Sequence, residues 1–138
     1  MKITPHFWLY LFWLTALMAT AGSLFFSEVM YFIPCTLCWY QRIFMYPLVL
    51  IGIVGILKKD KSFFYFAMPL ASFGTFFALY HNLVTYGIIA EELSPCSMGV
   101  PCSTHYIDWF GFITIPLLSL IAFLIILVSL YFFKKGSQ

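Results

Sequence analysis

The chain has 138 residues and a formal net charge of +2, and 63% of its residues are hydrophobic while only 9% are charged. Ordinary soluble domains carry about 25% charged residues, so the composition excludes a soluble globular protein and indicates one embedded in a membrane. Little sequence is left for a separate soluble domain. We therefore expect a single membrane domain over residues 1–138 and no nucleic-acid partner.

Four apolar segments can each cross a bilayer as a helix, which takes roughly 20 residues. Their expected spans are about 7–26, 41–57, 63–86 and 110–133. The second reaches the necessary length only if Trp39 and Tyr40 extend it. Helices are favoured because backbone groups must be paired inside lipid, and because the segments lack the alternation of barrel strands. The predicted fold class is an all-α membrane protein, a bundle of four transmembrane helices.

The first span has a competing interpretation as a cleaved signal peptide. Lys2, an apolar run and Ala19-Thr20-Ala21 resemble a signal with its small-residue cleavage site. The apolar run is longer than a usual signal core and continues as Leu24-Phe25-Phe26. We therefore expect a retained span.

Prolines and glycines inside the expected spans predict local features of the bundle. Transmembrane helices tolerate proline when neighbours pair the freed carbonyls, so we expect kinks rather than helix ends at Pro47, Pro69 and Pro116. Small residues let helix backbones approach closely, and Gly22, Gly52 and Gly55 are candidates.

The lysines set the expected orientation, because Lys and Arg near the ends of spans stay on the cytoplasmic side. They precede span one, fill the turn between spans two and three, and follow span four: Lys2, Lys58, Lys59, Lys61, Lys134 and Lys135. With an even number of spans, all six lie on one side. Both termini are therefore expected in the cytoplasm, and the protein in the plasma membrane.

The two remaining connections, about residues 27–40 and 87–109, must then face outward, and they contain all four cysteines. The outer face of a bacterial or secretory membrane is oxidising, whereas the cytosol keeps thiols reduced. This partition favours thiol chemistry on the extracytoplasmic side.

The cysteines form two closely spaced pairs, and each pair can close on itself. Cys35 and Cys38 have the Cys-x-x-Cys spacing of dithiols that cycle between thiol and disulfide, and Gly99 and Pro101 favour a turn that joins Cys96 to Cys102. Two purely structural disulfides are the alternative. Short rings stabilise little, however, and strained or exposed disulfides make better redox couples.

Metal binding by the four thiolates is a second alternative. Zinc ribbons use two Cys-x2-Cys units about 15 to 20 residues apart. Here the second pair has five intervening residues, and no Met-rich or His-rich segment accompanies it. We therefore expect no resident metal.

Cys38 and the only arginine, Arg42, occupy a special position. Pro34 interrupts the chain and the helical run begins near Cys38, where a helix N-terminus favours the thiolate. Arg42 follows four residues later on the same helix face. It could simply lie at the interface beside Trp39 and Tyr40. The functional interpretation is that Arg42 stabilises the Cys38 thiolate and an electron-rich ligand from the bilayer, a quinone.

Three elements together resemble a known family. They are "PCTLCWYQR", then "HNL" in span three, then a second cysteine pair followed by "DWFGF". With the four-span plan, the chain resembles the DsbB family of membrane disulfide-forming oxidoreductases, and in particular its Bacillus-type BdbC branch. The resemblance covers nearly the whole chain.

The resemblance implies an electron path from thiols to quinone. A reduced thioredoxin-fold partner, similar to DsbA or BdbD, would attack Cys96, and Cys102 would exchange with Cys35. Cys38 would then react with bound menaquinone or ubiquinone from the membrane pool. The family pattern also places Arg42 and His81 at the quinone site. Span three runs outward, so His81 lies in its last two turns, in the leaflet of Arg42.

The chain departs from the better-known members in two ways, and two other functions stay open. Only five residues separate Cys96 from Cys102, and Gln41 stands where other members can carry Glu. A reductase similar to vitamin K epoxide reductase is one rival, although its active Cys-x-x-Cys usually lies late in the chain. A non-enzymatic metal-binding or assembly protein is the other. His6 and His105 have no assigned role.

Overall fold

The computed structural model describes residues 4–58, 60–97, 99–103, 111 and 113–137. Four long helices form most of it: α1 (Pro5–Glu28), α2 (Thr36–Lys58), α3 (Phe63–Thr85) and α4 (Ile115–Gly136). Two short 3-10 turns, η1 (Glu91–Leu93) and η2 (Pro95–Ser97), lie between α3 and α4. The predicted four-helix bundle is confirmed.

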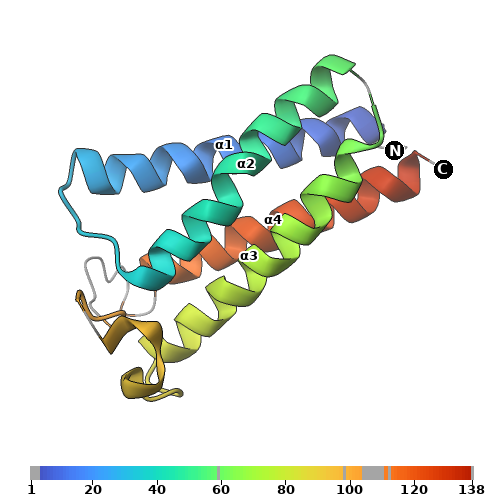
Figure 1. The fold of residues 1–138 in the computed structure, drawn as a ribbon. Coiled ribbons are helices and arrows are strands. Elements are labelled where there is room, and N and C mark those ends of the chain that lie inside the picture. The colour runs from blue at the N-terminus through green and yellow to red at the C-terminus, as the bar shows by residue number, and fades with distance from the viewer. Residues whose placement is uncertain (1–3, 59, 98, 104–110, 112, 138) are drawn as a thin grey trace.

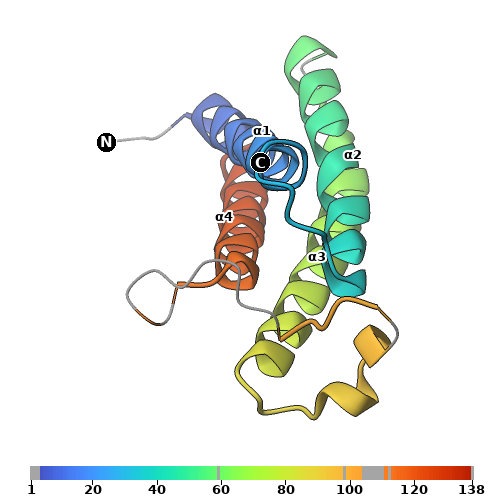
Figure 2. The ribbon, with the colours of Figure 1, turned by 90° about the vertical axis from the view of Figure 1, so that its left-hand side faces the viewer.

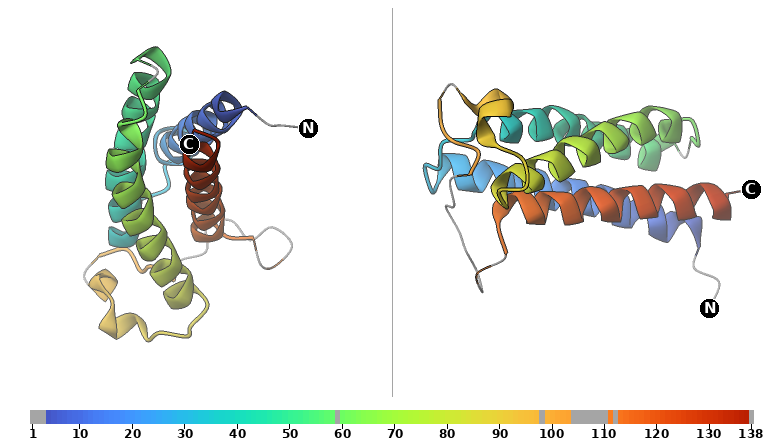
Figure 3. Two further views of the ribbon diagram at one scale, coloured as in Figure 1. Left: turned by 90° about the vertical axis from the view of Figure 1, so that its right-hand side faces the viewer. Right: turned by 90° about the horizontal axis from the view of Figure 1, so that it is seen from below.

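Each helix packs against two neighbours, so that α1, α2, α3 and α4 follow one another around the bundle and α4 returns to α1. Successive helices run in opposite directions (Figure 1). Both termini and the α2–α3 turn lie at one end of the bundle. The α1–α2 connection and the segment with η1 and η2 lie at the other (Figures 2 and 3).

The outer surface of the bundle is apolar along its length. All four helices are long and hydrophobic enough to span a bilayer, and large side chains such as Met18, Leu50, Phe66 and Tyr131 are exposed on them. Lipid is the environment that suits such a surface. The chain is therefore a multi-pass membrane protein.

The described lysines gather at the end of the bundle that holds the termini: Lys58, Lys61, Lys134 and Lys135. Two of them tie segments together there. Lys61 Nζ donates to the Ser137 carbonyl at 2.6 Å, and Lys134 Nζ lies 4.7 Å from the centroid of the Phe64 ring. Lys2 and Lys59 lie outside the described residues.

Aromatic side chains fill the space beside three of the glycines. A Cβ atom at Gly52 would meet Trp13 of α1, one at Gly55 would meet Phe63, and one at Gly74 would collide with the buried Phe123 ring of α4. Close packing at Gly52 and Gly55 is thus observed, but aromatic side chains approach these two positions rather than the helix backbone that was predicted. At Gly22 the predicted close approach is wrong, because no atom lies within 4 Å of the position that a Cβ atom would take there.

Two prolines lie inside helices as predicted, and the third does not. Pro47 and Pro69 are internal to α2 and α3, but Pro116 stands in the first turn of α4. Thr114 caps that helix, with its hydroxyl accepting from Leu117 N at 3.4 Å. A first-turn N–H has no helical partner, so proline costs nothing there. The predicted kink at Pro116 is wrong.

The helix starts also differ from the expected spans at the cysteine end. Helix α2 begins at Thr36, two residues before the predicted start of the helical run near Cys38 and well before the expected span at residue 41. Helix α4 begins at Ile115 rather than near residue 110. The "DWFGF" element and His105 fall on residues 104–112, of which the structure describes only Gly111 and leaves His105 outside.

Candidate active site

The start of α2 holds the first cysteine pair. The Cys35 carbonyl accepts a hydrogen bond from Trp39 N at 3.1 Å, so Cys35 caps the helix and Cys38 lies in its first turn. Both are free thiols, and their Sγ atoms are 3.2 Å apart. At that separation the two sulfurs can share one proton or close into a disulfide with little movement.

The second pair is closed. Cys96 and Cys102 form a disulfide, with their Cα atoms 5.6 Å apart. Gly99 has a φ of +117°, a conformation that glycine adopts without the steric cost of a side chain, and it lets the short ring turn back. The predicted closure of this pair is confirmed.

A carboxylate anchors the segment that carries the disulfide. Glu91 of η1 accepts from the Ser103 hydroxyl at 2.7 Å and from Ser103 N at 3.3 Å. The Ser103 hydroxyl is the main cause that lowers the pKa of Glu91. These bonds tie the residue after Cys102 back to the start of the segment.

The two cysteine pairs meet at Cys35. The Sγ atoms of Cys35, Cys96 and Cys102 all lie within 4.8 Å of one another. The short second loop therefore does reach Cys35, which the sequence left open. Cys96 and Cys102 are each only 3% exposed, so the described conformation shields both sulfurs from a partner.

His81 of α3 lies at this junction. Its Nε2 atom is 3.6 Å from Cys35 Sγ and 3.4 Å from the Cys102 carbonyl oxygen. Its Nδ1 atom is 2.8 Å from the side-chain nitrogen of Gln41. Hydrogen bonding with Cys38, and then with His81, outweighs burial and lowers the pKa of the Cys35 thiol.

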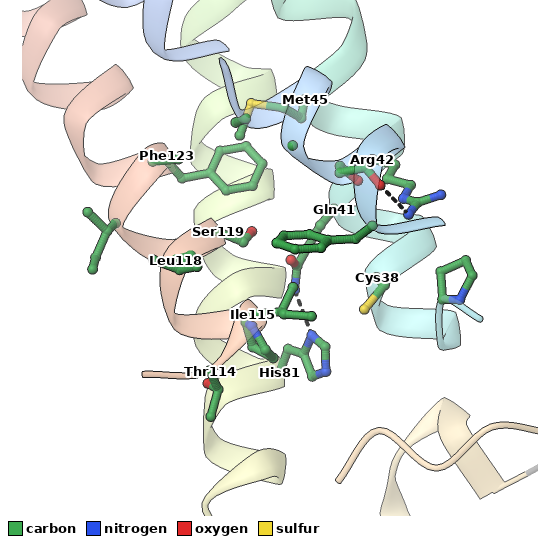
Figure 4. Close-up of a pocket in the computed structure, with 18 of the residues that line it drawn as sticks. Cys38, Gln41, Arg42, Met45, His81, Thr114, Ile115, Leu118, Ser119 and Phe123 are labelled. Carbon is green, nitrogen blue, oxygen red and sulfur yellow. Dashed lines mark hydrogen bonds between the residues drawn. The ribbon is translucent and has the colours of Figure 1, made fainter. Parts of the chain in front are cut away.

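A cavity of about 530 Å³ opens beside the junction, within the size range of small-molecule sites. All four helices line it, and most of the lining is apolar. Its ionisable and amide groups include those of Cys38, Gln41, Arg42 and His81 (Figure 4), and Cys35 and Tyr46 line it as well. Gly22 also lines it, which explains the empty space beside that residue.

Arg42 is held at the cavity wall by α1. One guanidinium nitrogen donates to the Ser23 carbonyl and to the Ser27 hydroxyl, each at 3.1 Å. The guanidinium also lies 5.3 Å from the centroid of the Trp39 ring. Both oxygen acceptors are uncharged, so these neighbours orient the positive charge without neutralising it.

Sequence reasoning singled out the cysteines, Arg42 and His81, and the structure brings all of them to one end of the bundle. It missed the contacts of Gln41 with His81 and of Ser27 with Arg42. An amide at the start of an apolar span, one residue before the arginine, was the available signal for Gln41. The Ser23-x3-Ser27 spacing, which places both serines on one helix face, was the signal in α1.

Comparison with known proteins identifies the family to which the chain belongs. The family model described as disulfide bond formation protein DsbB matches residues 5–133. Disulfide bond formation protein C of Bacillus subtilis is 48% identical over 126 residues, which cover 91% of each chain. A probable disulfide formation protein of Oceanobacillus iheyensis is 50% identical over 121 residues, 87% of this chain and 83% of the relative. No solved structure gives a significant match.

A third relative, probable disulfide formation protein C of Halalkalibacterium halodurans, is 48% identical over 116 residues, covering 84% of this chain and 85% of the relative. Family membership implies disulfide oxidoreductase activity, in agreement with two cysteine pairs that meet in one site. The chain therefore belongs to the DsbB family of membrane proteins that form disulfide bonds.

Proposed function

We propose that the protein is a membrane thiol:quinone oxidoreductase. It reoxidises an extracytoplasmic thioredoxin-fold thiol oxidase and passes the electrons to quinone, which supports disulfide formation in secreted proteins. The single observation that carries this proposal is the placement of Cys38: it faces the cavity, while its partner Cys35 lies within 4.8 Å of the Cys96–Cys102 disulfide. The Cys35–Cys38 pair thus lies next to the second cysteine pair, which would donate electrons, and next to the cavity, which would hold the electron acceptor.

The cavity suits a quinone in size and in chemistry. A quinone is a flat apolar ring with two carbonyl oxygens, and its bound form needs an apolar slot and a donor for an oxygen. The lining is apolar apart from a few groups, and Arg42 offers guanidinium N–H groups that its α1 contacts leave free to donate. When bound, quinone would accept two electrons and two protons and become quinol.

The chain's own groups carry the electrons to that point. The Cys96–Cys102 disulfide, which is buried in the described conformation, must first become exposed. The partner's two thiols then reduce it, and the partner leaves with a disulfide. The new Cys96 and Cys102 thiols then open the Cys35–Cys38 disulfide and close their own again. This leaves two electrons and two protons on Cys35 and Cys38, the dithiol state seen here. Cys38, at the cavity, then delivers them.

The lysine distribution supports an orientation for this path. Lys and Arg near span ends stay in the cytoplasm, so the lysine-rich end with both termini faces inward. The cysteine end then faces the oxidising side of the plasma membrane, where a secreted or anchored partner can reach it.

Purified protein with quinone and a reduced thioredoxin-fold oxidase provides the direct test. Wild-type protein should form quinol in proportion to partner disulfide, and Cys38→Ser should form none while Cys96–Cys102 stays reducible. Quinol formation by Cys38→Ser at the wild-type rate would overturn the proposal. Net electron flow from quinol to the partner's disulfide would instead favour the reductase similar to vitamin K epoxide reductase.

Metal binding stays a second candidate because one observation favours it. Ligand atoms of Cys35, Cys38 and His81 lie within 4.8 Å of one another, and two sulfurs with one imidazole suit Zn²⁺ or Cu⁺. A metal bound one to one as purified, together with no quinone reduction, would support this function over the first.

A further inference from the structure

His81 is enclosed by partners on both ring nitrogens. The residue is 1% exposed, and Gln41 beside it is 7% exposed, so water does not compete for these contacts. Nε2 faces Cys35 Sγ at 3.6 Å and the Cys102 carbonyl oxygen at 3.4 Å. Nδ1 faces the side-chain amide of Gln41 at 2.8 Å. The ring therefore spans from the amide of α2 to the junction of the two cysteine pairs.

The groups around Nε2 decide which nitrogen carries the proton. A carbonyl oxygen can only accept, and a thiolate can only accept, so a favourable contact with either requires Nε2–H. In the neutral ring Nδ1 is then an acceptor and needs a donor. The NH₂ end of the Gln41 amide supplies it. The opposite amide orientation would set oxygen against the Nδ1 lone pair, so the two sides of the ring select one arrangement.

Thr85 also contacts the carbonyl that makes this selection. Its hydroxyl, one turn after His81, lies 2.9 Å from the His81 carbonyl and 3.4 Å from the Cys102 carbonyl. The single hydroxyl proton is shared between the two carbonyls and favours the nearer one, and the Cys102 carbonyl lies within reach of both Thr85 and His81 Nε2. The proton on Nε2 consequently points to the place where sulfur bonds are exchanged.

We propose that Gln41 is a positioning residue that holds His81 as the Nε2–H tautomer, and that this N–H assists disulfide exchange between the two cysteine pairs by stabilising the Cys35 thiolate. The inference rests on the proposed function and deepens it by assigning a site for the internal exchange step. His81, which also lines the cavity, is thereby given a role toward Cys35 in addition to any role toward a ligand.

The assisted step conserves atoms and electrons. Cys102 attacks Cys35, which forms a Cys35–Cys102 bond and releases Cys38. Cys96 then attacks Cys102, which closes the Cys96–Cys102 bond and expels Cys35 as a thiolate. Two electrons pass to the first pair, and the two thiol protons of the second pair end on the first pair or in water outside. A thiolate leaves faster when it is stabilised, and Nε2–H supplies that stabilisation without giving up its proton.

The tautomer can be tested directly on otherwise intact protein. The chain has three histidines, so His6→Gln with His105→Gln leaves His81 as the only one. Nitrogen NMR of ¹⁵N-histidine in this protein should show Nε2 protonated and Nδ1 as an acceptor. Gln41→Leu should abolish the single fixed tautomer. A proton found on Nδ1 with Gln41 present would overturn the inference, whether or not the protein reduces quinone.

The exchange rate is the second measurement, and it needs no quinone. Protein with Cys35–Cys38 oxidised is mixed with dithiothreitol without oxygen, quenched in acid and alkylated to follow each pair. Electron arrival at Cys35–Cys38 should slow about tenfold in Gln41→Leu, the size expected for one hydrogen bond to a charged sulfur. Dithiothreitol can also reduce Cys35–Cys38 directly. The double variant Cys96→Ser with Cys102→Ser measures that direct rate, which is subtracted from the observed rate.

Asn82→Leu is the matched control. Asn82 is also a buried amide near the end of α3, but among the described residues its side chain donates to the backbone carbonyls of Ala78 and Pro116 and to no histidine or cysteine. Its loss should lower stability and leave the His81 tautomer and the exchange rate unchanged. Equal slowing in Gln41→Leu and Asn82→Leu would overturn the inference. Failure of quinone reduction with a normal exchange rate would overturn only the proposed function.

Discussion

The contacts of the Arg42 guanidinium distinguish an arginine that only reaches the lipid headgroups from one that serves a ligand in the cavity. Two uncharged oxygens of α1 and the Trp39 ring hold it at the cavity wall, and neither neutralises it. An arginine that only reaches the headgroups would need no such tether inside the bundle. The observed contacts therefore favour a role toward a ligand that gains negative charge on reduction.

Replacing Arg42 by alanine should slow quinone reduction about tenfold or more, because a charge-assisted hydrogen bond to the ligand is lost. Exchange between the cysteine pairs should continue, since the hydrogen bonds described for Arg42 go to Ser23 and Ser27 of α1 and not to a cysteine or to His81. Steady-state quinol formation and quenched exchange measure the two steps separately. Ser27→Ala is the control, because it removes one tether and keeps the charge. Equal loss in both steps would indicate a structural arginine.

Glu91 should make the stability of the segment that carries the Cys96–Cys102 disulfide depend on pH. Its pKa is lowered in the folded protein by the Ser103 hydroxyl, so its contribution to stability is present above the ordinary glutamate pKa. The contribution is lost as the pH falls through the lowered value. The anchor at Ser103 should therefore weaken only in acid.

A phosphine reductant, which acts at low pH, can detect this release. Reduction of Cys96–Cys102 should accelerate as wild-type protein is acidified below the usual titration range of glutamate. Glu91→Gln should remove most of this acid response, because its amide does not titrate. Glu92→Gln changes the neighbouring exposed carboxylate and should behave as wild type. An unaltered acid response in Glu91→Gln would show that the anchor does not depend on the carboxylate.

At the scale of the helices, α1 supplies a wall of the cavity through a residue that has no side chain. No atom lies within 4 Å of where a Cβ atom of Gly22 would sit, and Gly22 faces the cavity. A larger residue there fills the cavity without displacing the core. The glycines at 52, 55 and 74 behave in the opposite way, because aromatic rings already occupy their side-chain positions.

Gly22→Leu should therefore block ligand entry while the fold stays intact. We expect a KM for quinone raised about tenfold, from overpacking of the ligand's site, and a slightly higher thermal midpoint, since leucine favours helix over glycine. Ala21→Leu adds a similar side chain to the exposed, lipid-facing side of α1 and should leave the KM unchanged. Unchanged quinone kinetics in Gly22→Leu would exclude this cavity as the quinone site.

The helices themselves were predictable from the sequence, because a span needs only length and hydrophobicity. The start of α4 was not, since a proline read inside an apolar run hides the capping role of Thr114. The sequence also does not show whether a glycine faces a packed side chain or an empty cavity, because Gly22 and Gly52 look alike until the neighbouring helix is placed. The Gln41–His81 contact joins residues 40 positions apart on different helices, so only the packing of α2 on α3 reveals it.

For the whole molecule, the asymmetry of charge between the two ends of the bundle decides on which side the chemistry takes place. The described lysines lie with the termini, and the four sulfurs lie at the opposite end. Because a span cannot turn over without carrying its charged flanks through lipid, the orientation should hold for every molecule in the membrane.

Two introduced cysteines can test this orientation after the four native ones are changed to serine. Leu93 is 79% exposed at the cysteine end, and Asp60 is exposed in the opposite turn, where its replacement leaves every lysine in place. An impermeant maleimide applied to intact cells should label Leu93→Cys and should reach Asp60→Cys only after permeabilisation. Labelling in the reverse order would place the sulfurs in the reducing cytosol. There the thiol pools would oppose a net flow of electrons from secreted partners to quinone, since a dithiol is oxidised only against a suitable compartment potential.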